Sequence, residues 1–142
     1  MKLPDVNVLL GAVNASSAEH ESARRWLEAA LDAPAGVGFA WVALLGFIRI
    51  STRAGILPRP LALEQALMVV RDWIEAPTAR ILHPTERHGP LLARLLLSVG
   101  SGGNLATDAH LAALAIEHGA TLTSFDADFE RFVELDFARL RA

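Results

Sequence analysis

Short strand-like segments alternate with longer helical patterns along the whole chain, and this alternation limits the possible folds more than any other feature. Strand candidates cover residues 2–7, 37–40, 79–82 and 121–124, with a further short strand around Phe137. Strands that are joined by helices pair in parallel and are covered by helices on both faces. The sequence therefore predicts an α/β fold with a mostly parallel sheet of about five strands.

The segments between the strands carry helical periodicity. Ser16 and Glu19 match a capping box at the start of the second helix. The glycine-rich segment 100–103 lacks the lysine and the spacing of a phosphate-binding loop, so we expect a flexible linker there. The length of 142 residues fits one domain over residues 1–142. Helices are expected over residues 8–13, 16–31, 42–53, 63–76, 86–99 and 106–118.

The composition excludes several classes of protein. Without cysteine the chain can form neither disulfides nor thiolate metal sites, so any metal must be held by oxygen or imidazole. A net charge of -3 argues against broad electrostatic binding of nucleic acid, and phosphate contacts would have to be local. We expect a cytoplasmic protein without a membrane segment, because the longest apolar stretch, residues 39–48, is too short to span a bilayer.

Three aspartates fall where strands end or a helix begins. Asp5 ends the first strand candidate, Asp126 follows the strand at 121–124, and Asp108 opens a helix. Ligands of an open parallel sheet bind outside the carboxyl ends of its strands, so we expect these side chains to converge. Each aspartate alone has a simpler explanation, because any of them could cap or polarise the start of the helix that follows it.

The helix at 106–118 has a polar side, which His110 and Glu117 mark, and an apolar side, which Asp108 shares. Asp108 is therefore expected to face inward. Carboxylates that converge repel one another unless a cation joins them. Mg²⁺ suits such a site because it prefers oxygen ligands and keeps several waters, and it activates water for phosphodiester hydrolysis.

The order of these acidic motifs resembles that of PIN-domain ribonucleases. The resemblance rests on residues 5–7, 104–109 and 124–129 and spans nearly the whole chain. Residues 41–51 further resemble a segment of many bacterial VapC toxins. The resemblance implies a single PIN-like domain, a Mg²⁺-dependent endoribonuclease with Mn²⁺ as substitute, an RNA substrate, a VapB-like antitoxin and a homodimer.

The resemblance also assigns roles to individual residues. It implies that Asp5, Asp108 and Asp126 are catalytic and bind the metal, with Asp128 as a further ligand candidate. The remaining candidates, Asn7 and Ser124, would orient carboxylates or waters by hydrogen bonds.

One position departs from the family pattern. PIN domains usually carry a glutamate on the third helix, and Gly46 occupies the matching position. The site would then hold one carboxylate fewer, although a glycine there could also serve close helix packing. A non-catalytic PIN-like module that only binds a partner is therefore an alternative. A receiver-like phosphotransferase is disfavoured because Lys2, the only lysine, lies at the wrong end of its strand.

Other candidate signals carry less weight. No histidine pair has the local spacing of a metal-binding helix, and we expect His110 and His118 at the surface without a role. The apolar residues within 39–48 cannot all point inward, so some are expected to meet a second copy or an antitoxin segment. We expect the tryptophans in the core or in an interface rather than stacked on bases; they are Trp26, Trp41 and Trp73.

Overall fold

The computed structural model describes residues 1–100 and 105–142, which form one sheet of five parallel strands in the order β3-β2-β1-β4-β5. The predicted parallel sheet is confirmed. Because β1 lies at the centre beside β4, the carboxyl ends of these two strands meet at one edge. The strands are β1 (Lys2–Pro4), β2 (Val37–Phe39), β3 (Ala79–Ile81), β4 (Thr121–Ser124) and β5 (Phe137–Arg139).

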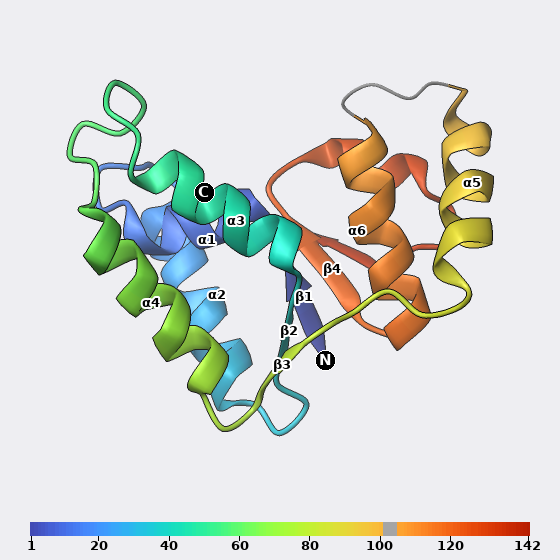
Figure 1. Ribbon diagram of the computed structural model, residues 1–142, viewed down its shortest axis with the longest axis horizontal. Helices are drawn as coiled ribbons and strands as arrows, with labels where there is room; N and C mark the ends of the chain where they lie inside the picture. Colours follow the sequence, from blue (N-terminus) through green and yellow to red (C-terminus); the bar gives the residue numbers. More distant parts are fainter. Residues whose placement is uncertain (101–104) are drawn as a thin grey trace.

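Helices cover both faces of this sheet, as the alternating pattern predicts. Figure 1 shows α1 to α4 on one side of the strands and α5 and α6 on the other. The helices are α1 (Val6–Val13), α2 (His20–Asp32), α3 (Trp41–Ser51), α4 (Leu63–Glu75), α5 (His88–Val99) and α6 (Leu105–His118), followed by the 3-10 helix η1 (Ala127–Arg131). None of the helices within the described residues is long and apolar enough to cross a membrane.

The sheet separates two hydrophobic cores. The core under α1 to α4 contains Trp73, whose ring stacks on Phe39 and meets Phe47 edge to face at 4.8 Å between ring centroids. The core under α5 and α6 includes Leu122 of β4 and Phe129 of η1, both fully buried. Burying large apolar side chains of this kind contributes roughly 1.5–3 kcal/mol each. The central strands are therefore held rigidly between two packed layers.

Two local predictions about helix starts are wrong. Helix α1 begins at Val6 rather than near residue 8, because the Asp5 carboxylate caps it. The capping box of Ser16 and Glu19 does not form; α2 begins at His20, and Ser17 Oγ instead accepts a hydrogen bond from the Glu19 backbone N–H at 3.1 Å. Most of the expected linker at 100–103 lies outside the described residues.

Candidate active site

Asp5 lies directly after the central strand β1 and is 7% exposed. Its Oδ1 accepts a hydrogen bond from the Val6 backbone N–H at 2.7 Å, and its Oδ2 accepts one from Ser124 Oγ at 2.8 Å. The capping explanation is therefore correct for one oxygen of this carboxylate. The other oxygen is tied to the end of β4, so Asp5 links the two central strand ends.

Ser124 and Asn7 form the polar support of this edge. The Ser124 hydroxyl is fully buried, and it accepts hydrogen bonds from Asn7 Nδ2 at 2.9 Å and from the Asp126 backbone N–H at 3.0 Å. Asn7 Oδ1 accepts a hydrogen bond from the Phe125 backbone N–H at 3.2 Å. These bonds fix the Asp5 carboxylate and the chain that leads to Asp126, which is the contact pattern expected of orienting residues. Their part in catalysis stays a prediction.

Asp108 lies in the first turn of α6 and is half-buried. Burial is the main cause that raises its pKa from 3.8 to about 6, and the negative charges of Asp5, Asp126 and Asp128 raise it further. Only Arg131 lowers it among the causes that act on this carboxyl group. The charges of Asp5, Asp126 and Asp128 thus act on the Asp108 carboxyl, and the convergence of all four on one metal stays a prediction.

The electrostatics of Asp5 point the same way. Burial raises the pKa of the Asp5 carboxyl, hydrogen bonds from Ser124 and Val6 oppose that rise, and the charge of Asp126 adds to it. Two half-buried or buried acids in one region therefore both resist ionisation. A cation between them would remove that cost.

Asp126 and Asp128 lie at the start of η1. Asp126 Oδ1 accepts a hydrogen bond from the Asp128 backbone N–H at 2.9 Å and so caps this short helix, as its simpler explanation predicts. Asp128 is exposed, and its Oδ1 lies 3.6 Å from the Arg131 guanidinium. Asp128 is therefore exposed to solvent, whereas Asp5 is buried.

The donor set fits a hard cation that keeps much of its water. Within residues 1–100 and 105–142, no three His, Asp or Glu side chains lie close enough together to hold a metal ion by themselves. The four aspartates nevertheless offer oxygen donors, and Mg²⁺ is commonly bound by one or two carboxylates with water in its other positions. The residues present therefore offer the oxygen donors that such a cation takes, and which of them bind it directly or through water stays a prediction.

Gly46 is buried in α3 against the first residue of α1. A Cβ atom at this position would lie 3.1 Å from Val6 Cγ2, which is a tight contact. The glycine thus lets α3 approach the start of α1, directly beside Asp5. This contact supports the packing explanation, and the alignment of Gly46 with the family's glutamate stays a prediction.

The prediction that Glu117 lies on the polar side of α6 is wrong. Its side chain has 0% exposure, because Thr85 and His88 from the preceding segment cover it. No local spacing signals these contacts, since the partners lie 29 and 32 residues away in sequence. Sequence reasoning also missed Arg131 and Arg139 as cations beside the acidic edge; Arg139 Nε donates to the Phe125 carbonyl at 3.4 Å.

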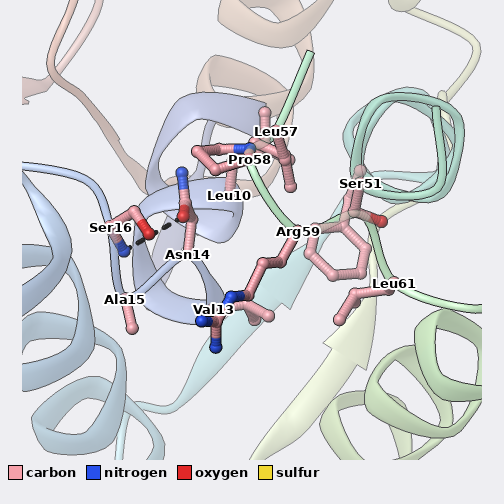
Figure 2. A pocket seen from close by; sticks show the side chains of 11 residues that line it. Leu10, Val13, Asn14, Ala15, Ser16, Ser51, Leu57, Pro58, Arg59 and Leu61 are labelled. Carbon is pink, nitrogen blue, oxygen red and sulfur yellow. Dashed lines mark hydrogen bonds between the residues drawn. The ribbon is translucent and has the colours of Figure 1, made fainter. Parts of the chain in front are cut away.

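A cavity of about 520 Å³ lies away from the aspartates, between α1, α3 and the segment after α3. Figure 2 shows Leu10, Pro58 and Leu61 around it, with Arg59 extending along it. Its lining is mainly apolar and contains none of the candidate acidic residues. The cavity is therefore suited to apolar side chains rather than to phosphodiester chemistry.

Comparison with known proteins gives consistent results. The model of the PIN domain family matches residues 2–135. Ribonuclease VapC37 from Mycobacterium tuberculosis is 54% identical over 132 residues, which cover 93% of this chain and 92% of the relative. The structure of Mycobacterium tuberculosis VapC20, a sarcin-ricin loop cleaving toxin, aligns with a TM-score of 0.69 at 21% identity over 95% of this chain and 98% of that one. VapBC2 from Rickettsia felis, solved with a promoter DNA fragment, aligns with a TM-score of 0.69 at 18% identity over 99% and 98%.

Proposed function

The chain belongs to the PIN domain family, and from this premise we propose that it is a Mg²⁺- or Mn²⁺-dependent endoribonuclease, the toxin of a VapBC-type pair. The observation that carries the proposal is the charge that gathers around Asp108, whose pKa is raised to about 6 by burial and then by Asp5, Asp126 and Asp128. The similarity to a protein named as a ribonuclease over 93% of the chain supports the same activity.

Different residues of the chain would bind the cation and orient its ligands. Asp5 and Asp108 would hold the cation, with Asp126 acting directly or through water and Asp128 as a further ligand candidate. When bound, the cation would polarise a phosphoryl oxygen and favour ionisation of a water. Ser124 keeps Asp5 Oδ2 in one orientation through a 2.8 Å bond. That fixed carboxylate can accept a hydrogen bond from a water, or bind a cation, without rearranging.

Two arginine side chains beside the candidate acidic residues are suited to bind RNA phosphates. Arg131 and Arg139 are both exposed and lie next to the strand and turn that carry Ser124 and Asp126. Arginine can bind phosphate oxygens with two parallel N–H donors. We expect these two residues to hold the RNA backbone while the aspartates act on the scissile bond.

Apolar surface on α3 supports a protein partner. Trp41 is 44% exposed and Leu45 is 59% exposed, so these two side chains of the apolar stretch do point outward. With the cavity next to α1, they offer an apolar surface of the kind that forms the centre of an interface. We propose that a second copy and a VapB-like antitoxin cover this surface, and that the complex acts in the cytoplasm, where its RNA lies.

Cleavage of a labelled single-stranded RNA by the purified protein tests the activity. We expect cleavage with Mg²⁺ or Mn²⁺, none with chelator, and none with Asp5→Asn. Asp72→Asn is a matched control because Asp72 is an exposed aspartate on α4. Cleavage that persists in chelator, or that survives in Asp5→Asn, would exclude the mechanism.

A non-catalytic PIN-like module that only binds a partner is the second candidate. The observation that favours it is Gly46, which the family resemblance matches to the usual glutamate and at which a side chain would press on Val6. This module would bind antitoxin but leave RNA intact under every metal condition. The same cleavage assay therefore separates the two functions.

A further inference from the structure

A buried carboxylate joins α6 to the segment before α5, on the side of α6 away from Asp108. Glu117 Oε1 accepts hydrogen bonds from the Thr85 backbone N–H at 2.8 Å and from Thr85 Oγ1 at 2.6 Å. Its Oε2 lies 2.5 Å from His88 Nδ1. His110 lies two positions after Asp108 on α6, which turns the two side chains about 200° apart around the helix. The residues of α6 in this second cluster, His110 and Glu117, therefore lie on a different face of the helix from Asp108.

These contacts fix which nitrogen of His88 carries a proton. Burial favours the neutral form of Glu117, but hydrogen bonds from Thr85 and His88 outweigh it and hold the pKa of this carboxyl below its ordinary value. An ionised carboxylate has no proton to donate, so His88 Nδ1 must donate to it. In the neutral ring, His88 Nε2 then keeps a free lone pair.

That lone pair faces a second imidazole. His88 Nε2 lies 2.9 Å from His110 Nδ1, and the two ring centroids are 4.7 Å apart with an angle of 75° between the planes. A straight N–H···N hydrogen bond of about 2.9 Å would hold the ring centres about 5.2 Å apart. Two imidazole nitrogens that each lie about 2.05 Å from one cation at a right angle, as in the square-planar geometry of Ni²⁺ or Cu²⁺, are about 2.9 Å apart, with ring centres about 4.6 Å apart; the tetrahedral angle of Zn²⁺ would separate the nitrogens by about 3.3 Å. The observed approach is closer to the second arrangement.

We propose that His88 Nε2 and His110 Nδ1 form a binding site for a divalent transition metal such as Ni²⁺ or Cu²⁺, with Glu117 orienting the His88 ring. A metal-bound histidine characteristically donates its other ring N–H to a carboxylate, which is the role that Glu117 has here. Imidazole suits Zn²⁺, Ni²⁺ and Cu²⁺, whereas carboxylate oxygens suit Mg²⁺ and Mn²⁺. Two protein ligands leave the remaining positions to water, in keeping with the lack of a three-residue cluster in the described part of the chain.

The site would tie two segments of the fold together. His88 is the first residue of α5 and His110 lies in α6, so a shared cation would hold the start of α5 against α6. Metal that binds only the folded state raises the melting temperature.

Nickel titration by calorimetry tests the site. In Asp108→Asn, which removes a carboxylate of the candidate acidic site, we expect one equivalent of Ni²⁺ to bind to the histidine pair with the affinity that the pair has in the wild type. His110→Ala should weaken binding at least about tenfold, and Glu117→Gln about 10- to 100-fold. His83→Ala is a matched control, since its side chain is exposed on the neighbouring loop and makes no part of the pair.

A measurement on the unmodified chain makes the test independent of how the variants fold. Cu²⁺ bound to the wild-type protein should show, by electron spin-echo modulation, coupling to two imidazole rings. Coupling to one imidazole or to none would overturn the proposal, because the two rings would then only share a hydrogen bond. Equal Ni²⁺ affinity of the wild type and of folded His110→Ala would overturn it as well.

Discussion

Removing the negative charge of Asp108 should stabilise the metal-free protein at neutral pH. The pKa of this carboxyl is raised from 3.8 to about 6, first by burial and then by the charges of Asp5, Asp126 and Asp128. That difference corresponds to about 3 kcal/mol if it is taken in full. Because the side chain is only half-buried, screening by solvent and salt reduces this to about 1–2 kcal/mol.

The sign of the effect follows from the direction of the shift. Since the pKa is higher in the folded state, the folded protein binds the proton more tightly than the unfolded chain does, and stability falls as the pH rises from about 3.8 to about 6. Asp108→Asn lacks this loss. It should raise the melting temperature by about 3–6 °C at pH 7.5, and about a third of that gain should remain at pH 4.5.

Differential scanning calorimetry in chelator, at both pH values, measures this effect. Asp72→Asn serves as control because it removes the same charge from an exposed site on α4. Adding Mn²⁺ at pH 7.5 should raise the melting temperature of the wild type and leave that of Asp108→Asn unchanged. If Asp108→Asn melts below the wild type at pH 7.5, or if both respond equally to Mn²⁺, then Asp108 is not destabilised by burial and by the charges of the other aspartates.

Three further changes test the residues next to Asp5 and the exposed surface of α3. Ser124→Ala should lower RNA cleavage about 10- to 100-fold, since Asp5 loses its 2.8 Å bond; Thr123→Val, whose buried hydroxyl has no partner among the described residues, should leave cleavage unchanged. Gly46→Glu should tighten Mn²⁺ binding measured by calorimetry, whereas Gly46→Ala, which makes the same 3.1 Å contact with Val6, should not; equal affinities would refute the alignment. Trp41→Ser with Leu45→Ser should lower the mass found by light scattering to that of a monomer, while Met68→Ser, exposed on α4, should not; an unchanged mass would move the dimer interface elsewhere.

The order of the elements could be predicted from the sequence because its signals are local. Apolar periodicity marks each helix and strand, and the strand Thr121–Ser124 was predicted with its observed bounds. The approach of Asp5 to Ser124 also follows from the pattern, since parallel strands bring their carboxyl ends to one edge. Both inferences need only the period of the sequence and the rules of parallel sheets.

Contacts between distant segments could not be predicted in the same way. A helical wheel assigns Glu117 to the solvent side because glutamate is polar, and it carries no information about the segment that covers it. Only the folded chain brings Thr85 and His88 to this carboxylate, 32 and 29 residues away. The start of α1 was misjudged for a related reason, since a side chain that caps a helix also sets its first residue.

The two carboxylates of α6, Glu117 and Asp108, differ in whether the fold offsets the cost of burying their charge. Glu117 is the more deeply buried of the two, yet its pKa is lowered, because Thr85 and His88 donate hydrogen bonds that outweigh the cost of burial. Asp108 is less buried, yet its pKa is raised, first by burial and then by the charges of Asp5, Asp126 and Asp128. A fold that supplies donors for one buried acid and surrounds the other with like charge leaves an energetic cost at the second that a bound cation would remove. That cost is consistent with the proposed metal-dependent activity at Asp108, whereas Glu117 acts as a support for the ring of His88.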